Sequence, residues 1–369
     1  MAVPRPTKLR STPIRDLAAL VGADDPASEV SVTGVTLDSR AVRQGDLYAA
    51  LPGARAHGAD FAGQAASAGA VAVLTDRAGV DRMTAAGLAL PAVVVEHPRA
   101  ALGAVSAHVL GTEHLALRLV GITGTNGKTT TAYLVHSALT ALGRRPGLIG
   151  TVETRIGDER LHSVRTTPEA PELHAVLAVM AERGLDTCVM EVSSHALAQH
   201  RVDGVVYDVA LFTNLSQDHL DFHTDMDDYF DAKASLFTPE RARQGLVCLD
   251  DAWGRRLVER SGIPVTTIGT AAASSPSSTR AAAAIAVLVT LKSPGRLDLR
   301  WRSTSGPVSR NAAGSLPSTW IRQSASAAVP MVVTGMPERS TRRRPHASST
   351  QTRPWRARSG VNNDALASK

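Results

Sequence analysis

Short apolar runs alternate with helical patterns along the first 270 residues of the chain. Uninterrupted runs such as Ala70–Leu74 are typical of buried strands, whereas apolar residues at helical spacing predict a helix over 131–142. Strands are expected at 32–40, 45–51, 70–74, 91–95, 115–122, 186–192, 207–213 and 245–249, and helices at 14–21, 60–68, 131–142, 173–183 and 226–237. This alternation predicts an α/β fold with mostly parallel strands and with ligands outside the carboxyl ends of the strands.

Pattern and composition divide the chain into four parts. We expect a loose leader at 1–13, an N-terminal α/β domain at 14–110, and a central domain at 111–270. Residues 271–369 begin with low-complexity sequence and lack periodicity, apart from an apolar run at 281–291. Such a composition predicts a disordered, basic tail.

Hydrophobicity and cysteine usage limit the class of protein. No segment reaches the roughly 18 uninterrupted apolar residues of a membrane span, and the N-terminus lacks the apolar core of a signal peptide. The two cysteines, Cys188 and Cys248, lie in strand-like apolar runs, so we expect buried thiols in a reducing compartment. These observations predict a cytoplasmic protein without membrane insertion.

The net charge of +6 comes from the end of the chain. Residues 271–369 hold fifteen Lys and Arg against three acids, whereas residues 1–270 hold 25 Lys and Arg against 31 acids. A nucleic-acid-binding module needs a basic face, which the first 270 residues do not indicate, so no nucleic-acid partner is expected. Salt-sensitive DNA binding by the Arg-rich tail is the alternative.

The stretch Thr123–Thr130 reads Thr-Gly-Thr-Asn-Gly-Lys-Thr-Thr and lies between an expected strand and an expected helix. This context favours a phosphate-binding loop, because backbone N–H groups and the dipole at a helix start attract phosphate. Lys128 would add a mobile cation, and Thr129 would add a hydroxyl for Mg²⁺. The general loop pattern has glycine where this chain has Ile122, and a structural turn is the alternative.

Polar side chains follow two later strands. Glu191 comes at the end of one predicted strand, where a carboxylate near a phosphate loop is well placed to hold Mg²⁺. The alternative is that Glu191 merely neighbours a helix N-cap. Asp218, His219, Asp221 and His223 follow the next strand, and on their own they are more typical of a solvated turn than of a ligand set.

Lysine is scarce, which draws attention to Lys233. The first 270 residues contain only Lys8, Lys128 and Lys233, against 22 arginines. Where arginine is the usual cation, a lysine indicates that an amine is needed. A surface lysine on a helix is an equally good interpretation.

Together these stretches resemble the Mur ligases, the ATP-dependent amide-forming enzymes of peptidoglycan precursor synthesis. The resemblance is strongest to the branch that adds the third residue of the stem peptide. It covers residues from about 30 to 270 and keeps the order of the family's motifs. The matching stretches are Thr36–Arg40 with Gly45–Leu47, Gly124–Thr130, Arg165–Pro168, Glu191–Arg201, and Thr213–His219 followed by Lys233.

The resemblance implies a role for each matching residue. ATP would be bound by Gly124, Thr125, Asn126, Gly127, Lys128, Thr129 and Thr130. The uridine end of the substrate would contact Leu37 and Ser39, with the loop of Ala54, Arg55 and Ala56 beside them. The muramoyl-peptide and its pyrophosphate would be held by Thr166, Thr167, Ser193, Gln199 and Arg201. One Mg²⁺ would bind Thr129 and Glu191, and a second would bind His219 and a carbamylated Lys233 (N6-carboxylysine), a ligand that guanidinium cannot mimic.

The implied reaction adds an amino acid to UDP-N-acetylmuramoyl-L-alanyl-D-glutamate, with ATP and Mg²⁺ as cofactors. The D-glutamate carboxylate would attack the γ-phosphate of ATP, and the incoming amine would then displace phosphate from the acyl phosphate. Lys128, Glu191, His219 and Lys233 would form the catalytic group. Arg- and Ala-rich composition mildly favours meso-diaminopimelate over lysine as the added residue, and we expect a monomer.

The family pattern continues beyond the point where this chain loses it. A complete enzyme finishes its central sheet and adds a C-terminal α/β domain, whose Asp-Asn-Pro-Arg stretch grips the incoming amino acid. That stretch is absent here, so an incomplete central sheet is expected. Two hypotheses stay open: a working ligase, and a catalytically inactive fragment that binds ATP and the UDP substrate.

Overall fold

A computed structural model describes residues 4–269 of the chain. All the described residues belong to one compact unit. The tail expected at 271–369 lies outside the described residues, and so does its apolar run.

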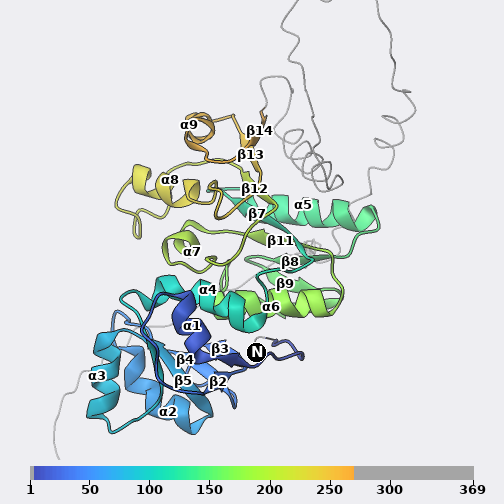
Figure 1. Cartoon of the computed structure of the whole chain (residues 1–369). Helices are drawn as coiled ribbons and strands as arrows, with labels where there is room; N and C mark the ends of the chain where they lie inside the picture. The colour runs from blue at the N-terminus through green and yellow to red at the C-terminus, as the bar shows by residue number, and fades with distance from the viewer. Residues whose placement is uncertain (1–3, 270–369) are drawn as a thin grey trace, which may run out of the picture. The chain divides into compact units, whose positions relative to one another are not determined.

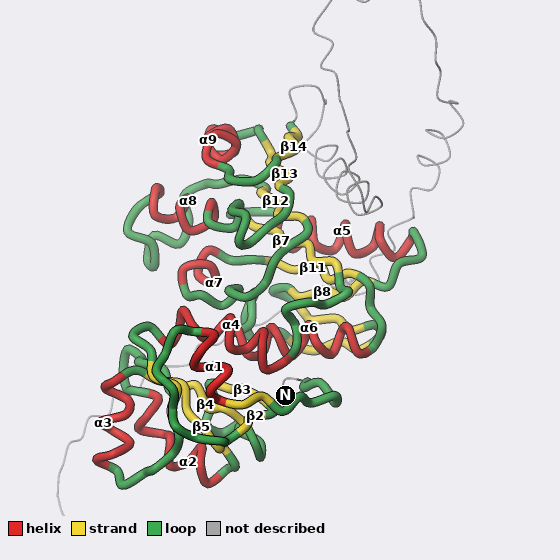
Figure 2. Tube along the Cα trace, in the orientation of Figure 1, coloured by secondary structure: helices red, strands yellow, loops and turns green. Residues whose placement is uncertain are grey.

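The helices and strands alternate along the described chain (Figures 1 and 2). The first elements are β1 (Thr12–Pro13), α1 (Ile14–Leu20), β2 (Ser31–Val32), β3 (Gly34–Thr36), β4 (Asp46–Ala49), the 3-10 turn η1 (Gly58–Phe61), α2 (Ala62–Ser67), β5 (Ala70–Thr75), α3 (Arg77–Ala85), β6 (Ala92–Val94) and α4 (Pro98–Leu110). The later elements are β7 (Arg118–Thr123), α5 (Lys128–Ala141), β8 (Pro146–Ile149), β9 (Glu153–Ile156), β10 (Glu159–His162), α6 (Ala170–Glu182), β11 (Thr187–Glu191), α7 (Ser194–Ala198), β12 (Val209–Phe212), α8 (Met226–Ala234), β13 (Gly245–Cys248), α9 (Ala252–Arg260) and β14 (Val265–Ile268).

A four-stranded parallel sheet, in the order β3-β4-β5-β6, organises the first part of the chain. Successive side chains of a strand point to opposite faces, so both faces of this apolar sheet need cover. Leu47 and Leu74 pack with α1 and α4 on one face. Tyr48 and Val73 pack with α2 and α3 on the other face.

The second sheet has eight strands in the order β10-β9-β8-β11-β7-β12-β13-β14. Strands β8, β11, β7, β12, β13 and β14 pair in parallel, whereas β9 and β10 form an antiparallel hairpin at one edge. Helix α5 covers one face, and α6, α7, α8 and α9 pack on the other (Figure 1). The predicted α/β fold with a mostly parallel sheet is confirmed. At the other edge, β14 is the last strand of the described chain.

The sequence pattern misses several elements for a physical reason. Helix α4 is apolar nearly all round because it packs against the four-stranded sheet and also against α6, so it lacks an amphipathic stripe. Strands β8 to β10 are short and were not expected. The segment 32–40, expected to be a strand that runs into a polar turn, does so: β3 ends at Thr36, and the Asp38 carboxylate accepts the backbone N–H of Arg40 in the turn.

The leader, expected to be loose, is bonded at several points over its described residues. Arg5 Nη1 lies 2.7 Å from both carboxylate oxygens of Asp46, a buried side chain in β4. Thr7 and Lys8 donate their backbone N–H groups to the carboxylate of Glu182 at the end of α6, over 3.0 and 2.7 Å. The leader therefore connects β4 to α6, while the domain boundaries at 110 and 270 stay a prediction.

Both cysteines are buried free thiols, as the sequence predicts. Cys188 lies in β11, and Cys248 ends β13. Within residues 4–269, no helix combines the length and the apolar character needed to cross a membrane.

Candidate functional site

The loop at Thr123–Thr130 joins β7 to α5, and the helix begins at Lys128. Gly124 and Gly127 have φ values of 140° and 85°, which favour glycine, and a Cβ at Gly124 would collide with the hydroxyl of Thr213. Ile122 is fully buried in β7, where it packs in the core beneath α5. The glycine of the general pattern is therefore replaced here by a residue of the sheet core.

The loop is held in shape by the segment that follows β12. Asn214 Oδ1 accepts the backbone N–H of Asn126 over 3.0 Å, and Asn214 Nδ2 donates to the carbonyl of Asn126 over 3.0 Å. Thr213 Oγ1 donates to the same carbonyl over 2.7 Å. Because β7 and β12 are adjacent in the sheet, the two strand ends support one loop.

Lys128 folds back over its own loop. Its Nζ donates to the carbonyl oxygens of Gly124 and Thr125, over 2.8 and 2.9 Å. Burial lowers the pKa of the Lys128 ammonium, while the charges of Glu191 and Asp218 act in the opposite direction. The cation therefore lies at the loop that is expected to bind phosphate.

Glu191 faces the start of α5. Its Oε2 accepts the hydroxyl of Thr129 over 2.9 Å, and its two carboxylate oxygens accept the backbone N–H and the hydroxyl of Thr151, over 2.9 and 3.2 Å. Only 1% of the Glu191 surface is exposed, and it forms no ion pair within the described part of the chain. Glu191 also lies two residues before Ser193, the N-cap of α7, as the alternative interpretation expects.

The residues expected to hold the muramoyl-peptide are connected to Glu191. Thr166 shares a 3.0 Å hydroxyl contact with Thr151. Thr167 Oγ1 donates to the backbone carbonyl of Glu191 over 2.9 Å and accepts the backbone N–H of Ser193 over 3.1 Å. These side chains therefore lie at the carboxyl end of β11, next to the phosphate loop.

Arg201 is anchored by the buried carboxylate of Glu169, a residue that the sequence patterns do not single out. Its Nε lies 3.0 Å from Glu169 Oε1, and its Nη2 donates to Gln199 Oε1. Glu169 also pairs with Arg99 over 3.2 Å, and Arg165 lies at 4.0 Å. No local signal marks Glu169, because its two closer partners, Arg99 and Arg201, are distant from it along the chain.

Lys233 is a buried residue of α8, with 1% of its surface exposed, which excludes the surface interpretation. Its Nζ donates to the Gly124 carbonyl over 3.0 Å and lies 4.4 Å from the centroid of the Tyr229 ring. Burial, followed by the nearby Lys128 charge, lowers the pKa of Lys233 to about 6, although Asp218 opposes the shift. The imidazole ring of His219 also packs against the Tyr229 ring, and the two ring centroids are 5.9 Å apart.

The described residues contain no cluster of three or more His, Cys, Asp and Glu side chains that could hold a metal ion. Any cation at this site would therefore also need other oxygen ligands. The structure brings Thr129 together with Glu191, and it brings both His219 and Lys233 against Tyr229.

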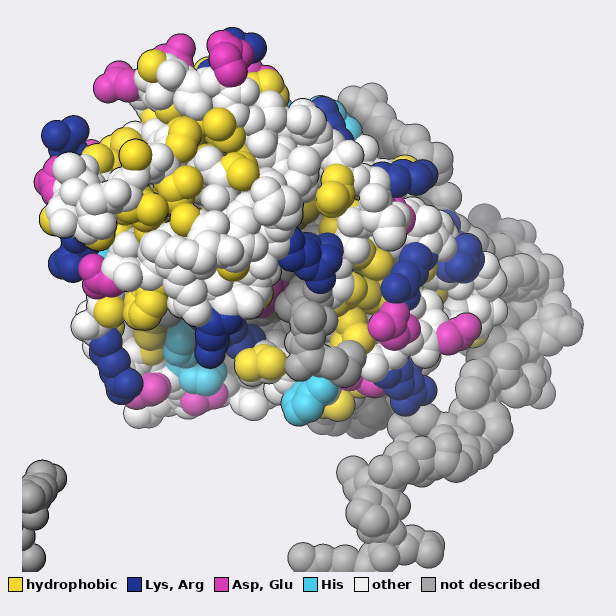
Figure 3. Space-filling view, turned by 90° about the horizontal axis from the view of Figure 1, so that it is seen from below, with side chains coloured by type: hydrophobic (Ala, Val, Ile, Leu, Met, Phe, Trp, Pro, Cys, Tyr) yellow, Lys and Arg dark blue, Asp and Glu magenta, His cyan; other side chains and the backbone are white. Residues whose placement is uncertain are grey.

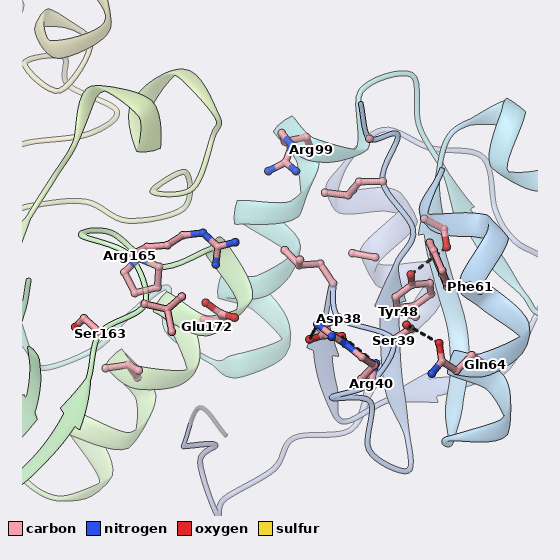
Figure 4. Close-up of a pocket in the computed structure, with 18 of the residues that line it drawn as sticks. Asp38, Ser39, Arg40, Tyr48, Phe61, Gln64, Arg99, Ser163, Arg165 and Glu172 are labelled. Atoms are coloured by element: carbon pink, nitrogen blue, oxygen red, sulfur yellow. Dashed lines mark hydrogen bonds and ion pairs between the residues drawn. The ribbon is translucent and has the colours of Figure 1, made fainter. Parts of the chain in front are cut away.

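A cavity of about 860 Å³ has Arg165 and Pro168, the residues that flank Thr166 and Thr167, in its lining (Figure 4). Leu37, Ser39 and Ala56 line it as expected, whereas Ala54 and Arg55 do not. Tyr48, Phe61 and Gln64 also line it, and Ser39 Oγ donates to Gln64 Oε1 over 3.0 Å. Arg165 and Pro168, which precede α6, and Glu172 in α6 also line it. Tyr48, Phe61 and Gln64 belong to no sequence motif, so the sequence alone did not indicate them.

Charged side chains of both signs are interspersed on the face shown in Figure 3. Basic groups lie next to acidic groups there.

A parallel sheet with a phosphate loop at the carboxyl end of β7, facing a carboxylate at the end of β11, defines a phosphate-loop α/β protein. Two family models match this chain. The model described as Mur ligase family, catalytic domain, matches residues 31–109, and that of the Mur ligase middle domain matches residues 122–292. The chain belongs to the Mur ligase family.

Its relatives specify the branch of the family. The chain is 58% identical, over 264 residues, to the UDP-N-acetylmuramoyl-L-alanyl-D-glutamate–2,6-diaminopimelate ligase of Streptomyces avermitilis, a match that covers 72% of this chain and 52% of the relative. It is 53% identical, over 281 residues, to the UDP-N-acetylmuramyl-tripeptide synthetase of Leifsonia xyli, covering 74% of this chain and 54% of that protein. The chain therefore spans about half the length of the curated relatives it matches.

Solved structures show the same likeness. A UDP-N-acetylmuramoyl-L-alanyl-D-glutamate–2,6-diaminopimelate ligase superimposes with a TM-score of 0.60 and 26% identity, covering 72% of this chain and 54% of that one. MurF from Acinetobacter baumannii shares the fold, with a TM-score of 0.53 and 18% identity, covering 77% of this chain and 66% of that one.

Proposed function

We propose that this chain carries the ATP and UDP-substrate sites of a ligase that adds meso-diaminopimelate to UDP-N-acetylmuramoyl-L-alanyl-D-glutamate. The observation that carries the proposal is the 2.9 Å contact between Thr129 of the phosphate loop and the buried Glu191. The relatives from Streptomyces avermitilis and Streptomyces coelicolor, both named as diaminopimelate ligases, favour diaminopimelate over lysine.

Thr129 and Glu191 fit a bound Mg²⁺. Both offer oxygen atoms, the ligands that Mg²⁺ prefers, and Glu191 is a buried anion without an ion-pair partner among residues 4–269. When bound, Mg²⁺ would neutralise charge on the ATP phosphates. Lys128 would turn from its loop carbonyls to the same phosphates, and the N–H groups at the start of α5 would face them.

Lys233 fits a second cation only after modification. The ammonium form of Lys233 has only hydrogen-bond donors and repels a metal ion. If the Lys233 nitrogen forms a bond to the carbon of CO₂ and loses a proton to solvent, the resulting carbamate supplies anionic oxygens beside His219. The burial of the amine against Tyr229 and the Gly124 carbonyl supports this proposal.

The remaining residues would hold the UDP substrate. Ser39 and Leu37 would contact uridine in the cavity, and Ala54, Arg55 and Ala56 would lie beside it. Thr166, Thr167, Ser193, Gln199 and Arg201 would hold the muramoyl-dipeptide. A D-glutamate carboxylate oxygen would bond to the γ-phosphorus as the bond to ADP breaks. The amine of diaminopimelate would then bond to the acyl carbon and lose a proton as phosphate leaves.

The test is phosphate release by the full chain, supplied with ATP, UDP-muramoyl-dipeptide and diaminopimelate. Release that requires all three compounds, and that Glu191→Gln abolishes, supports the ligase. Binding of ATP and of the UDP substrate without any release at high enzyme concentration would support the inactive binding fragment instead. Failure to bind either substrate would contradict both proposals.

We also propose that the chain is a monomer that works in the cytoplasm, without nucleic-acid or membrane partners. The buried free thiols support a reducing compartment. Size-exclusion chromatography with light scattering measures the molar mass in solution and so tests the monomeric state.

A further inference from the structure

Tyr229 touches the candidate site at several points, although the sequence patterns assign it no role. It is fully buried in α8. Its hydroxyl lies 3.1 Å from Thr125 Oγ1 in the phosphate loop, and its ring carries Lys233 Nζ at 4.4 Å from the centroid. The rings of His219 and His223 lie 5.9 and 5.0 Å away.

The direction of the hydrogen bond to Thr125 follows from its other partners. Thr125 Oγ1 donates to the Ser216 carbonyl over 3.2 Å and accepts the Ser216 backbone N–H over 3.1 Å. A hydroxyl has one proton and two acceptor sites, so one acceptor site is left. Tyr229 therefore donates its phenolic proton to Thr125.

Helix geometry explains the contact with Lys233. Residues four apart lie on the same side of a helix, so the Tyr229 ring lies next to the Lys233 side chain. The amine is held between this ring and the Gly124 carbonyl, to which it donates over 3.0 Å. Helix α8 and the phosphate loop are thus joined at two neighbouring loop residues, Gly124 and Thr125.

We propose that Tyr229 is a positioning residue that holds the phosphate loop and Lys233 as one unit. The hydroxyl fixes the loop through Thr125, and the ring fixes the amine of Lys233. The inference rests on the proposed function for what the loop and the lysine bind, but the contacts themselves do not depend on it. The two parts of the side chain should therefore have separable effects.

The first test removes only the hydroxyl. We expect Tyr229→Phe to weaken the binding of Mg·ADP, measured by calorimetry, by about 3- to 10-fold, the worth of one buried hydrogen bond. Tyr207→Phe is the matched control, because Tyr207 is equally buried and, within residues 4–269, its hydroxyl donates only to Met190 Sδ, over 3.3 Å. Thr125→Val should also bind Mg·ADP more weakly than wild type. The double variant, Tyr229→Phe with Thr125→Val, should bind Mg·ADP as tightly as the poorer-binding single variant.

The second test removes the ring. Tyr229→Leu should lose most of the carbamate signal that ¹³C NMR detects on Lys233 under ¹³CO₂, whereas Tyr229→Phe should keep it. A carbamate signal in Tyr229→Leu as strong as that of the wild-type chain would overturn the role of the ring. Equal loss of nucleotide affinity in Tyr207→Phe and Tyr229→Phe would overturn the role of the hydroxyl.

Failure of the proposed function is distinguishable from failure of this inference. Wild-type chain that binds no nucleotide would contradict the proposed function. In that case, the contact of Tyr229 with the phosphate loop is tested by measuring amide hydrogen exchange at residues 124–127. Faster exchange in Tyr229→Phe than in Tyr207→Phe supports the positioning role, and equal exchange overturns it.

Discussion

The buried His174 should make the stability of this chain depend on pH in a way that one substitution removes. His174 is fully buried in α6, far along the chain from the phosphate loop. Its Nε2 lies 3.2 Å from the carbonyl of Asp203, which can only accept, so Nε2 carries the proton. Nδ1 then accepts the hydroxyl of Thr112 over 2.6 Å. The folded chain therefore holds a neutral imidazole.

Burial lowers the pKa of His174 to about 4, although the backbone of Asp203 and the charge of Glu113 oppose the shift. In the unfolded chain the pKa returns to about 6.5. The unfolded state therefore binds an extra proton between these values, and stability falls as the pH falls from 6.5 towards 4. At 1.36 kcal/mol per pKa unit, the loss is about 2 kcal/mol at pH 5 and about 3 kcal/mol below pH 4.

The assay compares wild type with His174→Gln, whose side chain retains a donor and an acceptor but does not titrate. Urea unfolding is followed at pH 7.5, 6, 5 and 4.5. Every other titrating group is common to both chains, so the difference between the two unfolding free energies isolates His174. We expect that difference to shift by about 2 kcal/mol in favour of the glutamine variant between pH 7.5 and pH 5. A difference that stays constant with pH would refute the reasoning.

Three further substitutions separate function from stability. Glu191→Gln should abolish phosphate release. The melting temperature of the chain without nucleotide should stay unchanged or rise, because the substitution removes a buried unpaired charge. A lowered melting temperature together with residual phosphate release would contradict this prediction. Gly124→Ala should weaken Mg·ADP binding, measured by calorimetry, at least tenfold, because the added Cβ meets Thr213. Gly143→Ala is the control, because Gly143 also has a positive φ but lies in open space, and it should retain affinity for Mg·ADP. Equal affinities in the two variants would contradict this prediction. Arg5→Ala should lower the free energy of unfolding in urea by about 3–5 kcal/mol, because it leaves the buried Asp46 carboxylate unpaired. A loss below 1 kcal/mol, the range of an exposed pair, would refute the buried-pair account.

Local sequence signals were enough to predict the centre of the candidate site. The phosphate loop is continuous in sequence, and Glu191 follows a recognisable apolar strand. Lysine scarcity pointed to Lys233, which is buried against the loop. None of these signals requires knowledge of the strand order.

The supporting residues could not be predicted because their roles depend on strand order. Thr151 reaches Glu191 only because β8 pairs with β11, and β8 itself is a four-residue strand that periodicity does not reveal. Glu169 meets Arg99 and Arg201 only once α4, α6 and α7 are packed. The helix pattern also fails for α4, which is buried against both the sheet and α6.

The two lysines of the site share one acceptor, and this has a consequence for nucleotide binding. Gly124 O accepts from both Lys128 and Lys233, over 2.8 and 3.0 Å. Under the proposed function, Lys128 would exchange this bond for one to phosphate, in which both partners are ionised and the hydrogen bond is stronger. The loop keeps its shape during that exchange because Asn214 holds Asn126 and Tyr229 holds Thr125, and neither bond involves Lys128. Rigid support on α8 and on the strand next to β7 therefore leaves the lysine free to change partners.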